Sequence, residues 1–240
     1  MVSKNELKLI NSLHQKKYRN QHGLFFVEGI KVVAELLQSD FEAYEIYVTK
    51  DHLEAFKAFD VREISEHDLK KISALQRSNG VFGVFKIPKT VRPDLKDWIV
   101  VLDNIRDPGN LGTIIRLCDW FGIQYLVCSK GTVDCYNPKV LQATMGSIAR
   151  VNITYQDVTQ FLSTCTLPIY GAFMDGETVY HEQLPKAGVL VMGNEANGIS
   201  SETTSMVKKK ISIPQFGPAI TESLNVATAT AILLNEIRRE

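Results

Sequence analysis

The sequence feature that most constrains the fold is a series of short apolar runs within residues 98–213. Each run is apolar at consecutive positions rather than at alternate ones, and helical or loop segments separate the runs. Strands that are buried on both faces have this pattern, and they occur in mostly parallel sheets covered by helices. The pattern therefore predicts an α/β domain with strands at 98–102, 125–128, 151–154, 169–174, 189–192 and 211–213.

The first part of the chain predicts a smaller α/β unit. Apolar residues recur at helical spacing in 7–13 and 28–38, and strand-like runs occupy 25–27, 44–48 and 81–87. The segment KIPKTVRPDLKDW then brings two prolines and mixed charge, which is typical of a linker. We predict a small domain at 1–88, a linker at 89–97 and a second domain at 98–240.

Charge and cysteine content exclude several classes of protein. The 27 basic and 27 acidic side chains cancel, so the molecule as a whole has no field that would attract nucleic acid. Four cysteines without a C-x-x-C pair favour reduced thiols over disulfides or zinc, and no metal site is predicted. No apolar run approaches the roughly 20 residues of a membrane helix. The opening residues lack the apolar stretch of a signal peptide, so we expect a cytoplasmic protein.

Local basic clusters leave two interpretations open. One cluster contains Lys4, Lys8, Lys16, Lys17 and Arg19, and a second contains residues 208–210. Such clusters bind the phosphates of RNA, but solvated helix faces have the same composition.

Polar residues follow the first strand of the large domain in VVLDNIRDPGNLGTIIRLCDWFG. The strand ends at Asp103, and a helix is predicted from near Asn110, with Arg116 on a flank distinct from its apolar stripe. The carboxyl end of a strand is where open α/β sheets bind ligands, although an exposed helix arginine is the simpler interpretation. Neither the G-x-G-x-x-G fingerprint nor a phosphate-loop G-K-[ST] is present.

Two further strand ends carry polar turns. The segment Gly193-Asn-Glu195-Ala-Asn-Gly198 either serves a ligand or makes a tight connection with an exposed acid. A loop then leads to Ser223-Leu-Asn225, where Ser223 or Thr221 caps the last helix or faces an anionic group. That helix is apolar almost all round, which predicts burial on both sides, either in the core or in a subunit interface.

Together these segments resemble the signature motifs of the SpoU family, the TrmH-like RNA ribose 2′-O-methyltransferases of the SPOUT superfamily. The motif N-L-G-x-x-x-R is present from Asn110 to Arg116, G-x-E from Gly193 to Glu195, and S-L-N-V from Ser223 to Val226. The segment KKYRNQHGLFFVEGIKVV resembles the small substrate-binding domain that many members carry ahead of the catalytic one.

The resemblance implies properties that the composition does not show. The expected fold is a SPOUT-type α/β sheet with a deep trefoil knot, preceded by the small α/β substrate-binding domain. Members bind S-adenosylmethionine in the knot and act as homodimers whose sites are completed by the partner subunit. The substrate would be RNA, with ribosomal RNA favoured over transfer RNA.

The resemblance also assigns site residues. Arg116 would be the catalytic residue, and Asn110, Glu195, Ser223 and Asn225 would orient the RNA, Arg116 and the cofactor loop. An arginine with a pKa above roughly 12 is a poor general base, so a role in clamping phosphate and stabilising the developing alkoxide is preferred, and the base is left open. The cofactor would be held by residues of three loops: Met192, Gly193, Asn194, Ile213, Pro214, Ser223 and Leu224.

Two alternatives remain at this point. A non-catalytic RNA-binding or ribosome-assembly factor could keep the fold without the chemistry, although every motif position is intact. A nucleotide-dependent enzyme is disfavoured because the phosphate-loop lysine is missing.

Overall fold

The computed structural model describes residues 2–75, 78–217 and 222–239, and it consists of two compact units. Unit 1 contains Met1–Lys89 together with Asp134–Ala149. Unit 2 contains Thr90–Val133 and Arg150–Glu240. The segment 134–149 therefore packs with the N-terminal unit, although two strands of the other unit flank it in the sequence.

Unit 2 is built on a six-stranded sheet in the order β10-β8-β9-β5-β6-β7, and every neighbouring pair is parallel. Each of the predicted apolar runs overlaps one of its strands, so the prediction of a mostly parallel sheet is confirmed. The strands are β5 (Ile99–Leu102), β6 (Tyr125–Ser129), β7 (Asn152–Gln156), β8 (Ile169–Thr178), β9 (Val189–Met192) and β10 (Lys209–Ser212).

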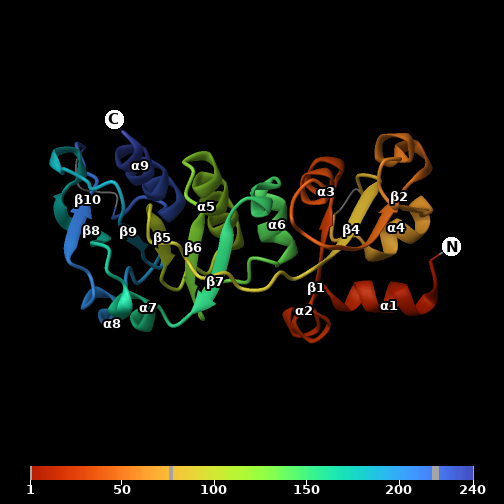
Figure 1. Ribbon diagram of the computed structural model, residues 1–240, viewed down its shortest axis with the longest axis horizontal. Coiled ribbons are helices and arrows are strands. Elements are labelled where there is room, and N and C mark those ends of the chain that lie inside the picture. The colour runs from red at the N-terminus through yellow and green to blue at the C-terminus, as the bar shows by residue number, and fades with distance from the viewer. Residues whose placement is uncertain (1, 76–77, 218–221, 240) are drawn as a thin grey trace. The chain divides into compact units, whose positions relative to one another are not determined.

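Helices cover both faces of this sheet. Helices α5 (Pro108–Trp120) and α9 (Val226–Arg238) lie side by side on one face, and α7 (Val158–Thr164) and α8 (Ser201–Thr204) lie on the other (Figure 1). The α7 side chains Val158 and Leu162 share a buried cluster with residues of β5, β6 and β9. A short 3-10 turn, η4 (Val179–His181), follows β8.

The last helix buries only one face within this chain. Its buried side chains are Val226, Ala227, Thr230, Leu233, Leu234 and Ile237, whereas Thr228 and Asn235 are exposed. The predicted burial on both sides is therefore wrong for the single chain. Arg238 fixes the end of the helix through a two-bond ion pair with Asp97, and this pair lowers the pKa of Asp97.

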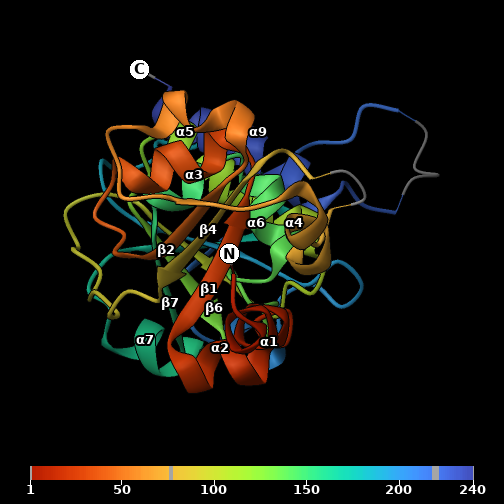
Figure 2. The same ribbon diagram turned by 90° about the vertical axis from the view of Figure 1, so that its right-hand side faces the viewer.

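Unit 1 contains a four-stranded sheet in the order β1-β4-β2-β3, in which β2 and β3 are parallel and the other pairs antiparallel. Helix α3 (Ile30–Leu37) packs on one face, and α1 (Lys4–Ser12) and α4 (Glu66–Ile72) pack on the other (Figure 2). The strands are β1 (Leu24–Glu28), β2 (Ala43–Val48), β3 (Arg62–Glu63) and β4 (Val81–Lys86). The short helical segments of the unit are α2 (Lys16–His22), α6 (Pro138–Thr144), η1 (Lys50–His52), η2 (Glu54–Phe56) and η3 (Ser147–Ala149).

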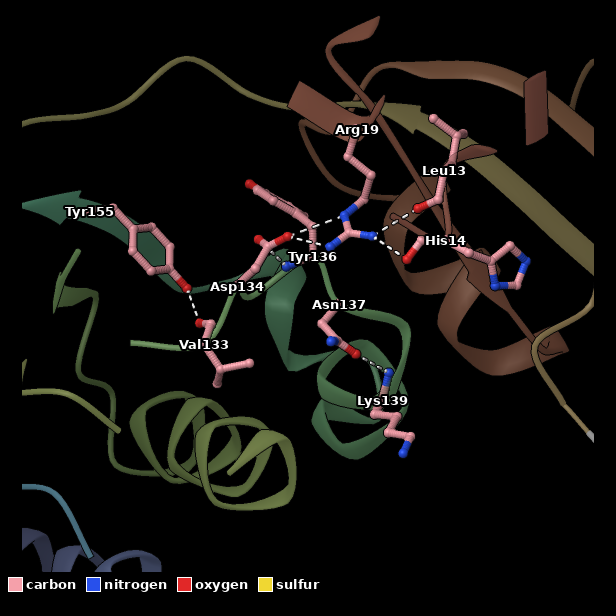
Figure 3. A network of polar contacts seen from close by, with 9 residues as sticks. All are labelled: Leu13, His14, Arg19, Val133, Asp134, Tyr136, Asn137, Lys139 and Tyr155. Carbon is pink, nitrogen blue, oxygen red and sulfur yellow. Dashed lines mark hydrogen bonds and ion pairs between the residues drawn. The ribbon is translucent and has the colours of Figure 1, made fainter. Parts of the chain in front are cut away.

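A buried ion pair attaches the segment 134–149 to α2 (Figure 3). The Arg19 guanidinium, 2% exposed, donates to Asp134 Oδ2 at 2.5 and 3.1 Å and to the carbonyls of Leu13 and His14 at 2.8 and 3.0 Å. On the unit 2 side of this junction, the Tyr155 hydroxyl donates to the Val133 carbonyl at 2.6 Å. Val133 is thus bonded to a residue of unit 2, and Asp134 to a residue of unit 1.

These contacts correct the interpretation of the basic clusters. Arg19 is a structural cation and is not available to an RNA phosphate. In the second cluster, Lys209 pairs with Glu182, and Lys210 lies near Asp175 and over the Phe173 ring. Acids on the same unit therefore offset much of that positive charge. Among the described residues, no helix has the length and apolarity needed to span a membrane.

The Arg19–Asp134 pair gives a stability prediction. Replacing Arg19 with Met leaves a buried carboxylate without its cation, so we expect unit 1 to lose about 3 kcal/mol of unfolding free energy. Urea unfolding followed by circular dichroism measures this loss. Lys17→Met, at an exposed position of the same helix, is the matched control and should change stability by less than about 0.5 kcal/mol. Equal effects of the two variants would show that the pair does not hold the segment.

Candidate active site

The first site segment lies where β5 ends and α5 begins. Asp107 caps the helix by accepting from the Asn110 N–H at 2.8 Å, and Pro108 occupies the first turn, where its missing N–H costs nothing. The helix therefore begins two residues before the predicted position. Leu111, Ile114, Ile115 and Cys118 form the buried apolar stripe of the helix, while Arg116 is exposed on a different flank. Burial raises the pKa of the Cys118 thiol, so this cysteine stays protonated and is no nucleophile.

The second segment is the turn that follows β9. The Asn194 and Gly198 backbones bond to each other in both directions at 2.9 Å, and Asn194 Oδ1 accepts from the Ala196 and Asn197 N–H groups. A Cβ on Gly193 would lie 2.3 Å from the Gly198 carbonyl carbon. Position 193 therefore has to be glycine because the backbone of the same turn passes close to it. From the sequence alone, a closely bound ligand was an equally good reason for a glycine here. Glu195 is held exposed near the tip of this turn.

Three side chains from distant parts of unit 2 form one hydrogen-bonded chain. Asn225 Nδ2 donates to Asn110 Oδ1 at 2.9 Å, and Asn110 Nδ2 donates to Glu195 Oε1 at 2.9 Å. Because the Asn110 amide donates at one end and accepts at the other, it fixes both neighbours at once. The structure therefore brings together Asn110, Glu195 and Asn225, as the resemblance implied for the site.

Asn225 also caps the last helix. Its Oδ1 accepts from the Ala227 and Thr228 N–H groups at 2.9 and 3.3 Å. The prediction that Ser223 caps this helix is wrong, because the helix begins at Val226; Thr221, the other predicted cap, lies outside the described residues. Ser223 is exposed two residues before the cap, and within the described part of the chain no hydrogen bond joins it to Asn110, Glu195 or Asn225.

A buried carboxylate supports this arrangement from behind. Asp103, 3% exposed, accepts from Ser200 N and Ser200 Oγ at 2.9 and 2.6 Å and from Asn104 Nδ2 at 2.8 Å. Asn104 has φ +60°, and its carbonyl accepts from Asn194 Nδ2 at 2.7 Å. The Asn104 N–H donates to Ser129 Oγ at 2.9 Å. The loops after β5, β6 and β9 are thus tied to one another.

Sequence reasoning missed this supporting set. Asp103, Asn104 and Ser200 look like ordinary loop residues in the sequence. The available signal was the position of Asp103-Asn104 directly after a buried strand, where a polar side chain has to find partners.

The predicted cofactor residues lie at the carboxyl ends of two strands and before α9. Met192 is buried, and its carbonyl accepts from the Asp103 N–H at 2.9 Å. That oxygen is therefore already used in a hydrogen bond between the ends of β9 and β5. Ile213 and Pro214 are half-buried directly after β10, and Leu224 is 46% exposed. Phe216, in the same loop, is 89% exposed. Apolar side chains thus stand beside the strand ends where the resemblance implies that S-adenosylmethionine binds.

The chemistry of these residues does not resemble that of a metal centre. Among the residues that the structure describes, no group of three or more His, Cys, Asp or Glu side chains is placed to hold a metal ion.

The sheet and the strand-end motifs together define an α/β protein of the SPOUT type. Residues 97–235 match the SpoU rRNA Methylase family, which covers more than half of the chain, and the chain belongs to this family. Residues 4–83 match the MRM3-like substrate binding domain. The resemblance stated from the three motifs is therefore confirmed.

Individual relatives extend over nearly the whole chain. The 23S rRNA (guanosine(2553)-2′-O)-methyltransferase RlmP of Bacillus subtilis is 28% identical over 94% of this chain and 93% of its own length. A putative RNA methyltransferase of the TrmH family from Porphyromonas gingivalis superposes with a TM-score of 0.91 at 38% identity, covering 99% and 98% of the two chains. The AdoMet-bound rRNA methyltransferase from Sinorhizobium meliloti gives 0.87 at 28% identity, covering 99% and 96%.

Asp103 gives a prediction about the support of the site. Asp103→Ala leaves the half-buried N–H and hydroxyl of Ser200 without their acceptor, which costs about 2 kcal/mol. We expect the melting temperature to fall by about 4–8 °C. Thermal unfolding measures this shift, with the exposed Asp175→Ala as control. If both variants melt like the wild type, Asp103 does not tie the loops together.

Proposed function

We propose that this chain transfers a methyl group from S-adenosylmethionine to a ribose 2′-hydroxyl of RNA, with ribosomal RNA as the substrate class. The observation that carries the proposal is the Asn225–Asn110–Glu195 chain, which joins all three family motifs at one edge of the sheet. Membership of the SpoU family and the AdoMet-bound S. meliloti structure support the same reaction. The name of RlmP, a 23S rRNA 2′-O-methyltransferase, supports ribosomal RNA over transfer RNA.

The chain's own residues have to position the RNA and the reacting hydroxyl. Bound S-adenosylmethionine supplies a methyl group on a positively charged sulfur. Arg116 lies about 9 Å along α5 from Asn110, at 1.5 Å of rise per residue. Its exposed guanidinium binds a phosphate next to the target ribose and stabilises the negative charge that develops on the 2′-oxygen. An arginine is a poor general base, so the proposal gives Arg116 no proton to remove and leaves the base unassigned.

The loops hold the cofactor in this proposal. Main-chain groups of Gly193, Ile213 and Leu224 bind its adenosine and methionine parts, with Met192, Asn194, Pro214 and Ser223 beside them. Glu195 and Asn225 fix the loops through Asn110, which lies in the first turn of α5. The deep trefoil knot in this region stays a prediction from the family resemblance.

The assembly is proposed to be a homodimer. Trp120, at the end of α5, is 84% exposed, and α9 beside it leaves its outer face uncovered in the single chain. A large exposed aromatic side chain is typical of interfaces. A cytoplasmic location belongs to the same proposal, in agreement with four cysteines in the reduced thiol form.

The first experiment is methyl transfer from labelled S-adenosylmethionine to total unmodified RNA, followed by alkaline hydrolysis. Alkali cleaves RNA through the free 2′-hydroxyl, so a 2′-O-methyl group protects the adjoining bond. Label in resistant dinucleotides would establish the reaction. Binding of RNA without transfer, in a protein that also fails to bind S-adenosylhomocysteine, would favour a non-catalytic RNA-binding factor.

Arg116 gives the sharpest prediction for this reaction. Arg116→Ala should lower kcat at least 100-fold, because it removes the donor aimed at the developing charge. Its affinity for S-adenosylhomocysteine, measured by calorimetry, should stay within about twofold of the wild type. Thr113→Ala, on the same exposed flank of α5, is the control. Full activity of the Arg116 variant would contradict the assignment.

Trp120 tests the proposed dimer. Trp120→Glu places a charge in the proposed interface and should give a monomer by light scattering, whereas Tyr44→Glu, at a 52% exposed site in unit 1, should leave the mass unchanged. A wild-type monomer at micromolar concentration would refute the proposal.

A further inference from the structure

Unit 1 contains a hollow of about 680 Å³ where the end of β2 meets the start of β4. Helices α3 and α4 contribute Ile30 and Glu66 to its lining. Pockets that bind small ligands have volumes of about 300–1,000 Å³, so this one has room for a nucleobase and its ribose. We call it the β2–β4 pocket.

Backbone pairing makes one wall of this pocket rigid. The Thr49 N–H donates to the Gly80 carbonyl at 2.8 Å, and the Gly29 N–H donates to the Val81 carbonyl at 2.9 Å. Gly80 has φ +75°, and a Cβ there would lie 2.2 Å from the His52 ring. The imidazole therefore lies directly against a glycine backbone, and a side chain at position 80 would displace it.

The lining has the chemistry of a site for a base rather than for a phosphate. Asp51 and Glu66 bring two carboxylates against the single ammonium of Lys70, so the net charge opposes an anion. The Asn79 amide both donates and accepts hydrogen bonds, as the edge of a base requires. The His52 ring and the 43% exposed Ile30 offer surfaces against which a flat base can pack. Proteins read single-stranded RNA by this combination of stacking and edge contacts.

We propose that the β2–β4 pocket binds one unstacked nucleobase of the RNA substrate, with an amino group of that base donating to Asp51 or Glu66. Cytosine, adenine and guanine carry such an amino group, whereas uracil offers a carboxylate only its ring N3–H, so the pocket favours the amino-bearing bases. The proposal rests on the proposed function, because it assigns the pocket to the RNA of that same reaction. It gives unit 1 a base-specific part in substrate choice, away from the methyl-transfer site of unit 2.

Steady-state methyl transfer with unmodified ribosomal RNA tests the pocket. His52→Ala and Asp51→Ala should each raise the KM for RNA about tenfold, the effect expected from one lost base contact, with kcat and the affinity for S-adenosylhomocysteine unchanged. The matched controls are His67→Ala and Asp60→Ala, two exposed side chains of the same unit that do not line the pocket. Melting temperatures of all four variants show whether they are folded.

Chemical footprinting supplies a readout that does not need catalysis. Wild-type protein should protect one amino-bearing base of the RNA from base-specific reagents. Ser78→Trp, which fills the pocket, and His52→Ala should both lose that protection. Unchanged KM and footprint in these variants would overturn the proposal, and so would tighter RNA binding by Asp51→Ala, which indicates a phosphate. If the wild type protects the base but methylates no ribose, the proposed function fails and the pocket stands.

Discussion

The rest of the site depends on the carboxylate of Asp103. It stands at the end of β5, the strand between β6 and β9, and it accepts three hydrogen bonds from Ser200 and Asn104. A buried charge is tolerable only when such donors surround it. Those same donors set the loops on either side of β5, so satisfying the carboxylate also places Glu195 within reach of Asn110. The exposed Asn225–Asn110–Glu195 chain is thus held in position by the buried hydrogen bonds of Asp103.

The sheet and part of the site could be predicted from the sequence because their signals are local. Each strand of unit 2 contains a short run of apolar residues, and each motif lies in the connection that follows one of these strands or at the start of the next helix. Helix caps are harder to predict, since Asn225 and Ser223 have equally suitable side chains, and only the backbone path decides that Asn225 receives the Ala227 and Thr228 N–H groups. The need for glycine at position 193 depends on the backbone path in the same way, because the turn brings the Gly198 backbone close to it.

Contacts between distant residues could not be predicted from one sequence. Arg19 stands among lysines and looks like part of a basic surface, but its partner Asp134 lies 115 residues further along the chain. The same pair explains why residues 134–149 belong to unit 1, although the strands β6 and β7 on either side of them belong to unit 2. Composition gave no sign of this, because the segment resembles an ordinary connection between two parallel strands.

The distribution of charge decides how such a protein can choose its RNA. The net charge is zero, Arg19 is buried, and Lys209 and Lys210 face acids, so the two basic clusters offer fewer cations to a phosphate backbone than the sequence suggests. Affinity that comes from phosphate contacts is indifferent to sequence, whereas contacts to bases are not. A chain with a weak electrostatic attraction must obtain more of its binding free energy from base contacts. A rigid, net-acidic hollow on the substrate-binding unit serves that requirement better than a further cluster of lysines would.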